Sequence, residues 1–305
     1  MIRSDGSMRE FTYNWEPEEY TDDGPDPILK ISKSSNGQFN WCPTKYHFNY
    51  REKIPQKITP EMARGTDIHN AREDMFKAYD LEKVSGDISK EDIIDYNYSL
   101  YPIDDHTDMY YAMACWDAEL LLKHKENGTI DNFLPVANEV MIDAEYMVRK
   151  RDYDHVELEN NYVVHLQGII DRVYFEQNEK FPEGIYIPFE LKTGKWSSNP
   201  AKATSMRQEM AFYKLLYDEA SDATLAEVGL DSQYEMGMWG WYYPTSNHIT
   251  LEKVKKVSTT ALKKKIASLI HAYEKNDFPA NYSEWNCPTC SYYEICPAAD
   301  MAGWI

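Results

Sequence analysis

Apolar residues recur at helical spacing in two long segments of the first half of the chain. In PEMARGTDIHNAREDMFKAYDLEK, which begins at Pro60, the residues Met62, Ile68 and Met75 fall on one side of a helix. A second helix is expected over DMYYAMACWDAELLLKHKENG, ending near Gly128. The pattern therefore predicts that the first part of the chain is mostly helical.

The pattern changes near Pro135, where β-rich runs replace the helices and a sheet is expected to begin. PVANEVMIDAEYMV, NYVVHLQGIIDRVYFE and GIYIPFELKTG are broken by Asn, Gly, Pro and charged turns, as is typical of strands. We expect a helix over ATSMRQEMAFYKLLYDEA, then strands over YEMGMWGWYYP and HITLEKV. A last helix, STTALKKKIASLIHAYEKN, has Ser258 or Thr259 as N-cap and Leu262 and Ile266 on its apolar face. This order predicts an α/β core with helical flanks.

Composition and charge limit the classes of partner. The chain has 305 residues, of which 43% are hydrophobic, and carries 32 Lys and Arg against 51 Asp and Glu, a net charge of −19. No overall positive field indicates a nucleic-acid partner, so any such partner must bind local basic patches. The chain has no signal-peptide pattern and no run of about 18 apolar residues, which predicts a soluble, intracellular (cytoplasmic) protein that is not bound to a membrane.

An Asp, a Glu and a Lys interrupt the apolar runs GIIDRV and FELKTGK. If IPFELKT is a strand, Glu190 and Lys192 point to the same face, and Asp171 ends the neighbouring run. Burying a charge is costly unless it is paired, and carboxylates that share a site suit Mg²⁺. A lysine beside them can orient the attacking water or stabilise charge that develops on phosphate. Alone, the triplet indicates either a structural ion pair or a site for phosphodiester hydrolysis.

Three of the five cysteines crowd into CPTCSYYEIC, as Cys287, Cys290 and Cys296. In an intracellular chain this crowding favours a metal over disulfides. With Cys42 as a fourth ligand, four thiolates suit either structural Zn²⁺ or an iron–sulfur cluster, and the ligand count does not decide between them. Cys115 lies on an apolar helix face and is expected to be a small buried residue outside this group.

GIIDRV followed by FELKTGK resembles the RecB-type branch of the PD-(D/E)XK nuclease superfamily, whose pattern is Gly-x-x-Asp-Arg, then Glu-x-Lys-Thr-Gly and a helix. Upstream, GTDIH is similar to the helical Gly-x-x-x-His of that family, and KISKSSNGQFNWCP is similar to its Ser-rich segment leading into Cys-Pro. The resemblance runs from about Lys30 to Pro297. It implies an α/β, restriction-endonuclease-like core, a central mixed sheet flanked by helices. The expected parts are an acidic N-terminal arm (1–28), a helical region with the first cluster cysteine (29–134), the nuclease core (135–276) and a C-terminal iron–sulfur segment (277–305).

The resemblance also implies the roles of the site residues. Asp171 and Glu190 would hold Mg²⁺ or Mn²⁺, with His69 and the backbone carbonyl of Leu191 as further ligands. Lys192 would position or activate the attacking water.

Three more residues are assigned less directly. Glu139 resembles an upstream glutamate of the family. The family's Gln-x-x-x-Tyr is not matched, because Gln208 lies five residues before Tyr213 and Glu209 takes the expected position. For Gln208 and Tyr213, contact with DNA and a purely structural role both remain open.

One upstream cysteine and a C-terminal trio around a RecB-type core are similar to the CRISPR-associated iron–sulfur exonucleases and the AddB-type nucleases. These relatives carry a [4Fe–4S] cluster. The resemblance therefore implies that Cys42, Cys287, Cys290 and Cys296 bind such a cluster, which would join the ends of the chain.

The function implied is a Mg²⁺- or Mn²⁺-dependent deoxyribonuclease, acting as an exonuclease on single-stranded DNA or free DNA ends. Endonuclease activity and an RNA substrate remain open. The alternative is a non-catalytic DNA-binding scaffold subunit of a nuclease–helicase or repair complex, although such subunits normally lose one of the Asp, Glu and Lys residues that this chain retains. The expected DNA contacts are Arg172, Lys195, Trp196 and the cluster Lys263 to Lys265.

Overall fold

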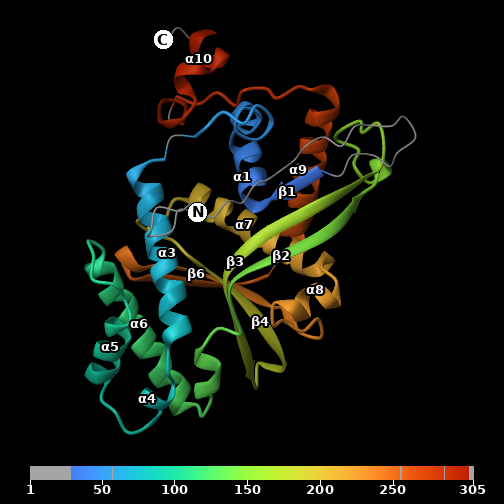
Figure 1. Cartoon of the computed structure of the whole chain (residues 1–305). Helices are drawn as coiled ribbons and strands as arrows, with labels where there is room; N and C mark the ends of the chain where they lie inside the picture. Colours follow the sequence, from blue (N-terminus) through green and yellow to red (C-terminus); the bar gives the residue numbers. More distant parts are fainter. Residues whose placement is uncertain (1–28, 57, 255, 285, 302–305) are drawn as a thin grey trace.

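A mixed sheet forms the centre of the molecule (Figure 1). The computed structural model describes residues 29–56, 58–254, 256–284 and 286–301, and within them the sheet has seven strands in the order β1-β3-β4-β6-β7, with β2 paired to β3 and β5 paired to β4. The strands are β1 (Leu29–Ser32), β2 (Ala137–Val148), β3 (Tyr162–Asn178), β4 (Phe181–Leu191), β5 (Glu235–Met236), β6 (Met238–Tyr243) and β7 (His248–Lys253).

The long strand β3 organises the sheet. Along one edge it pairs with β2, antiparallel from Tyr162 to Val173. Along the other edge it pairs first with β1, parallel from Val164 to Gln167, and then with β4, antiparallel from Arg172 onward. β4 in turn pairs in parallel with β6. The end of β4 and the middle of β3 therefore lie next to each other in the sheet.

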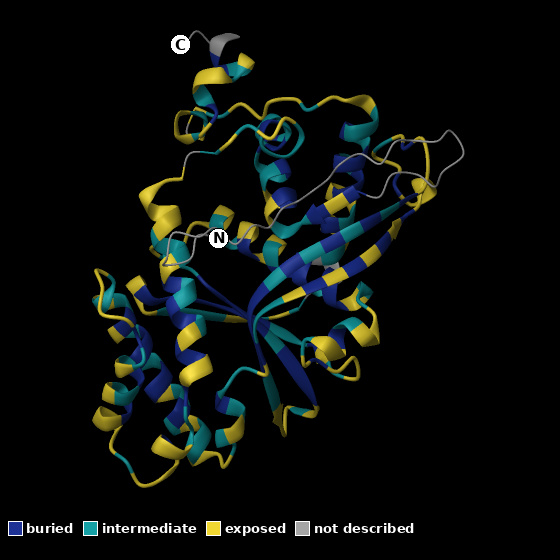
Figure 2. Cartoon of the chain, viewed as in Figure 1, coloured by how far each residue is buried: buried dark blue, intermediate teal, exposed yellow. Residues whose placement is uncertain are grey.

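Helices cover both faces of the sheet. Side chains alternate between the faces of a strand, so Trp239 and Trp241 of β6 pack into one core with α1, α7 and α9, whereas Tyr242 packs into a second core with α3, α5 and α6. Figure 2 shows the buried strands between these layers. The longer helices are α1 (Lys33–Trp41), α3 (Pro60–Ala78), α5 (Lys90–Ser99), α6 (Thr107–Glu126), α7 (Pro200–Glu219) and α9 (Lys256–Lys275); the short ones are α2 (Pro43–Tyr46), α4 (Glu82–Ser85), α8 (Asp222–Glu227) and α10 (Pro297–Met301).

The structure confirms the predicted α/β architecture with its mixed sheet and flanking helices. The prediction that the sheet begins near Pro135 was wrong, because β1 joins it much earlier. Four residues are too few to show a strand period, and only pairing with β3 makes this segment a strand. The last helix starts at Lys256, before the predicted N-cap at Ser258 or Thr259. The predicted arm, residues 1–28, lies outside the described residues, and the four-part division of the chain remains a prediction.

Within the described residues, no helix is both long and apolar enough to cross a membrane.

A buried ion pair lies between the helices of the second core. The guanidinium of Arg72 donates hydrogen bonds to both carboxylate oxygens of Asp117, the Nη2–Oδ1 distance is 2.6 Å, and the two side chains are 1% and 0% exposed. Tyr101 accepts a further bond from the same guanidinium. This ion pair connects α3 with α6, and its charged groups are inaccessible to water.

Replacement of Asp117 by Ala is expected to lower the free energy of unfolding by about 3 to 5 kcal/mol, because the Arg72 charge then stays buried without a counter-ion. Urea titration would measure this loss. The matched control is Glu119→Ala on the same helix, whose exposed pair with Lys90 is expected to contribute less than about 1 kcal/mol. Equal losses of unfolding free energy in the two variants would contradict the conclusion that the buried Arg72–Asp117 pair stabilises the fold more than the exposed pair does.

Candidate active site and cysteine cavity

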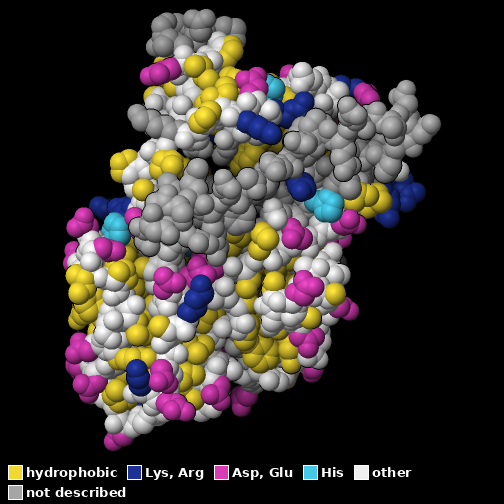
Figure 3. Space-filling view, viewed as in Figure 1, with side chains coloured by type: hydrophobic (Ala, Val, Ile, Leu, Met, Phe, Trp, Pro, Cys, Tyr) yellow, Lys and Arg dark blue, Asp and Glu magenta, His cyan; other side chains and the backbone are white. Residues whose placement is uncertain are grey.

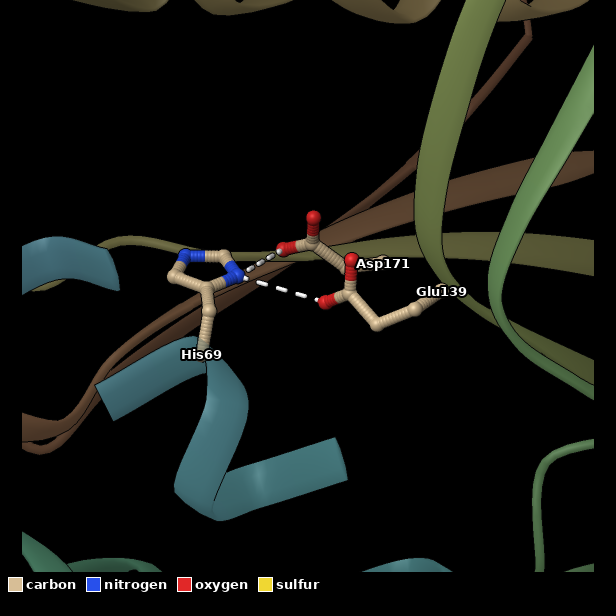
Figure 4. A group of neighbouring side chains, drawn as sticks. All are labelled: His69, Glu139 and Asp171. Carbon is tan, nitrogen blue, oxygen red and sulfur yellow. Dashed lines mark hydrogen bonds and ion pairs between the residues drawn. The ribbon is translucent and has the colours of Figure 1, made fainter. Parts of the chain in front are cut away.

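Three side chains from separate elements meet above the sheet. His69 lies on α3, Glu139 on β2 and Asp171 on β3, and their ligand atoms lie within 4.8 Å of one another (Figure 4). His69 Nδ1 is 3.4 Å from Glu139 Oε1 and 3.5 Å from Asp171 Oδ2. In the part of the chain that the structure describes, no other group of three or more His, Cys, Asp or Glu has its ligand atoms this close together.

The imidazole of His69 has a different partner on each nitrogen. Nδ1 faces the two carboxylates, while Nε2 lies 3.2 Å from the carbonyl oxygen of Leu191. Burial by itself would lower the pKa of His69, but the carboxylates of Asp171 and Glu139 more than offset this and raise it. A neutral ring that donates its Nε2 proton to Leu191 keeps the Nδ1 lone pair directed at the carboxylates, which is the form that a metal ligand requires.

Glu139 has an unusual backbone. Its φ is +49°, in the left-handed region that side chains other than Gly rarely adopt, although it lies within β2. Such strain costs on the order of 1 to 3 kcal/mol and concentrates at functional sites. Burial raises the pKa of its carboxyl, and the His69 hydrogen bond opposes that rise. The backbone geometry thus supports Glu139 as part of the site more strongly than the sequence did.

Glu190 and Lys192 extend the site from the end of β4. The Lys192 ammonium donates hydrogen bonds to Glu190 Oε1 at 3.0 Å and to Glu209 Oε2 at 2.6 Å. The backbone N–H of Leu191 between them donates to Asp171 Oδ2 at 2.7 Å. Burial by itself would lower the pKa of Lys192. The carboxylate of Glu190 more than offsets this and raises that pKa above its ordinary value, which favours the cationic form of the lysine.

A second lysine, which the sequence analysis missed, shares the same carboxylate. Lys33 Nζ lies 2.6 Å from Glu190 Oε1 and 2.6 Å from the Tyr213 hydroxyl. That hydroxyl is 2.8 Å from Glu190 Oε2 and 2.7 Å from the carbonyl oxygen of Ile169. Burial by itself would raise the pKa of Glu190. The ammonium groups of Lys192 and Lys33 outweigh burial and hold this pKa well below its ordinary value. Nothing in the segment KISKSS indicates this role, because it depends on the parallel pairing of β1 with β3.

One cavity of about 630 Å³ is lined by His69, Glu139, Asp171, Glu190 and Lys33. Lys192 does not line it and is joined to it through its hydrogen bond to Glu190. The structure therefore brings His69, Glu139, Asp171 and Glu190 together in one cavity. The expected set of metal-binding side chains was His69, Asp171 and Glu190, whereas the closest group contains Glu139 in place of Glu190, since two lysines and a tyrosine occupy the Glu190 carboxylate.

Some of the residues predicted to contact DNA are accessible in the structure and others are buried. Arg172 is only 2% exposed, so the expectation that it contacts DNA was wrong: its strand position turns it into the second core. Lys195 is exposed, and the half-buried Trp196 stacks on His248 with ring centroids 3.9 Å apart. Gln208 is exposed on α7 and does not line the active-site cavity.

The four predicted cluster cysteines converge on a separate cavity near the C-terminal end. Cys42, Cys287, Cys290 and Cys296 all line it. Backbone N–H groups point at two of the sulfurs, Asn281 at Cys42 and Ser283 at Cys287, each at 3.4 Å. Tyr292, beside Cys290, packs on Phe48 and donates to the carbonyl oxygen of Ile54, which ties this segment to the region around α2.

Cys115 lies away from this cavity, on α6. It is half-buried and not buried as expected, because it falls at the margin of the apolar face of its helix.

Comparison with known proteins identifies a family and several similar solved structures. Residues 30–297 match the model of the PD-(D/E)XK nuclease superfamily. The crystal structure of SSO0001 is similar over 91% of this chain and 90% of that chain, at 12% sequence identity and a TM-score of 0.39. A search of the curated proteins found no match. Membership implies a metal-dependent nuclease with DNA as substrate. Since the family match spans nearly the whole chain, this protein belongs to the PD-(D/E)XK nuclease superfamily.

Proposed function

We propose that this protein is a Mg²⁺- or Mn²⁺-dependent exonuclease that degrades single-stranded DNA from free ends and carries a structural [4Fe–4S] cluster. The observation that carries the proposed chemistry is the convergence of His69, Glu139 and Asp171 on one point beside the Glu190–Lys192 pair. Family membership supplies the class of reaction, and this geometry suggests which residues perform it.

The charge of the site supports a divalent ion. Four carboxylates, Glu139, Asp171, Glu190 and Glu209, lie near two ammonium groups, Lys33 and Lys192. The guanidinium of Arg172 also acts on Glu139, so the carboxylates outnumber the cationic groups by one when His69 is neutral. Carboxylates this close repel one another, and a hard cation with oxygen ligands relieves that repulsion.

Each residue of the site has a different proposed role in the reaction. His69, Glu139 and Asp171 would hold the ion, and Glu190 lies beside them with Lys33, Lys192 and Tyr213 on its carboxylate. The bound ion would supply Lewis-acid stabilisation of the phosphate and an acidified water. Lys192 lies between Glu190 and Glu209, which favour its cationic form, so it would donate a hydrogen bond to the attacking water or to the phosphate oxygen. Tyr213 fixes the Glu190 carboxylate by its hydroxyl.

Mn²⁺ affinity is expected to fall as pH drops through the raised pKa of His69, which lies above the ordinary value of about 6.5. A ligating imidazole must be neutral, so protonation competes with the ion, with a loss of up to about tenfold per pH unit below that pKa. Isothermal titration of Mn²⁺ from pH 5.5 to 8.5 measures it. His69→Asn should bind weakly with a flatter pH profile across this range; an unchanged profile would contradict the assignment of His69 as a ligand.

The net charge of the chain is −19, so its overall field repels DNA phosphates. DNA must therefore bind where Lys and Arg side chains are locally concentrated. Figure 3 shows acidic side chains spread over the lower part of one face, where Lys and Arg are few. Binding is then expected to weaken steeply with salt, since counterions leave when phosphates are neutralised.

A direct test uses anaerobically purified protein with end-labelled linear single-stranded, double-stranded and circular single-stranded DNA, and with RNA. Each substrate is incubated with Mg²⁺, with Mn²⁺ and with a chelator. The proposal expects metal-dependent loss of the linear single strand and an intact circle. Binding without cleavage of any substrate would support the alternative, a DNA-binding scaffold subunit. Cleavage of the circle would replace the exonuclease by an endonuclease.

Two observations support the cluster part of the proposal. The four thiols line one cavity, and two of them accept backbone N–H groups, as thiolates that bind metal commonly do. A four-iron cluster takes one thiolate on each iron, and four cysteines are the number that it requires.

A further inference from the structure

A second cavity, of about 520 Å³, lies between α1 and α7 and meets the active-site cavity. Lys33 and Ser34 line both cavities. We call the second cavity the amide groove, because four amide residues line it, Asn36, Gln38, Asn40 and Gln208, together with the single carboxylate Glu209. A substrate strand that leaves the Glu190–Lys192 pair past Lys33 would enter this groove directly.

One face of α1 forms a wall of the groove. Lys33, Asn36, Gly37, Asn40 and Trp41 all line it, at positions i, i+3, i+4, i+7 and i+8 of the helix. The opposite side of the helix is buried in the core. The sequence of α1 therefore places lysine, two amides and an indole along a single line that begins at the active site.

Two side-chain amide oxygens of this wall lack a hydrogen-bond partner among the described residues. Asn36 is 4% exposed, and its Oδ1 has no hydrogen-bond partner among the described residues; the buried Oδ1 of Asn40 has none either. An unsatisfied buried acceptor costs about 1 to 3 kcal/mol, so such groups call for an explanation. An amide side chain offers one acceptor and two donors, which match the edges of nucleobases.

Positive charge lies at both ends of the wall. Lys33 is at the active-site end, and Lys45 lies over the Trp41 ring at the other end, 4.6 Å from the ring centroid. Lysine ammonium groups bind phosphates, and a half-buried indole is a surface on which a base can stack. Phosphate, base-edge and stacking groups thus occur together within one groove.

We propose that the amide groove binds an unpaired nucleotide of the substrate strand, next to the phosphate that is cut. The inference rests on the proposed function and specifies where the strand lies. The nucleotide must be unpaired, because the base edges of a duplex are already occupied by their complements and cannot reach amides in a groove between two helices.

Gly37 provides a test that removes no contact. A Cβ built on it meets no atom within 4 Å, so a larger side chain there projects into open space and does not displace the protein. Gly37→Phe is expected to fold, since Gly is the poorer helix former, but to fill the groove. The matched control is Gly37→Ala, which adds only a methyl group.

The measurement is the Kd of a fluorescein-labelled oligothymidine single strand, by anisotropy with Ca²⁺ in place of the active metal, together with KM and kcat for its cleavage. Gly37→Phe is expected to raise Kd and KM about tenfold or more with kcat little changed, and Gly37→Ala to match the wild type. Asn40→Ala combined with Gln208→Ala should raise Kd about fourfold or more, by loss of two hydrogen bonds. Thermal melting and Mn²⁺ binding verify that each variant is folded.

The outcomes separate the two proposals. If the wild type cuts the single strand but Gly37→Phe binds and cuts it equally well, the amide groove is not a nucleotide site, whereas the proposed function stands. If Gly37→Phe weakens duplex and single strand alike, the requirement for an unpaired base is wrong. A wild-type protein that neither binds nor cuts the single strand overturns both proposals.

Discussion

Glu190→Gln and Lys192→Ala are each expected to fold as the wild type does and to cut DNA at least about 100-fold more slowly. A single charged or hydrogen-bonding group that acts on a developing phosphate charge contributes about 10²- to 10³-fold. Glu190 is 3% exposed and shared by two lysines, so glutamine keeps its shape while removing the charge that positions them. Cleavage of end-labelled single-stranded DNA at saturating metal measures the loss.

The matched control for these variants is Glu119→Gln. Glu119 lies on α6 and pairs with Lys90 at 2.9 Å, outside the active-site cavity. It should cut DNA at the wild-type rate. If Glu190→Gln melts at the wild-type temperature and still cuts normally, Glu190 is a structural group and the assignment of the site is wrong.

Replacement of any cluster cysteine by serine is expected to give a colourless and less stable protein, whereas the wild type prepared without oxygen is expected to be brown, with broad absorbance near 400 nm. Cys42 and Cys287 are separated by most of the chain, so coordinating both closes a long loop. A covalent crosslink of such a loop stabilises by roughly 4 to 5 kcal/mol, and a similar loss is expected in Cys42→Ser. Absorbance, iron analysis and urea titration measure the three effects.

Cys115→Ser is the control, since Cys115 lies on α6 away from the cysteine cavity. It should keep its colour and its stability. Finding about one zinc and no iron would replace the cluster with a zinc site but leave the long-loop argument intact. If Cys42→Ser retained all its iron and its stability, Cys42 would not be a ligand and the joining of the chain ends would be wrong.

Asp171, Glu190 and Lys192 could be recognised from the sequence because they lie in or next to long strands. Asp171 and Glu190 stand in long apolar runs that predict strands, and β3 pairs with β4 so that Arg172 lies opposite Phe189. Two-residue spacing then brings Lys192 back to Glu190, as predicted. The spacing argument depends only on local geometry.

Lys33 and Glu139 show where local reasoning fails. Lys33 reaches Glu190 from 157 residues away because β1 pairs with β3, and four strand residues carry no periodic signal. Glu139 reaches His69 only through a left-handed backbone, which no residue pattern in ANEVMI indicates. Arg172 was misassigned for the same reason, since which face of β3 is covered depends on α3 and α6.

The sequence by itself determined the helices and long strands, the PD-(D/E)XK membership and the candidate residues, because periodicity and motif spacing are properties of short segments. Only the tertiary structure decided which charges meet. It joined Glu139 to His69, placed two lysines on Glu190 and set the amide face of α1 beside α7. Those contacts depend on the register of distant strands and on helix packing, which are set by burial of the whole core and not by any single segment.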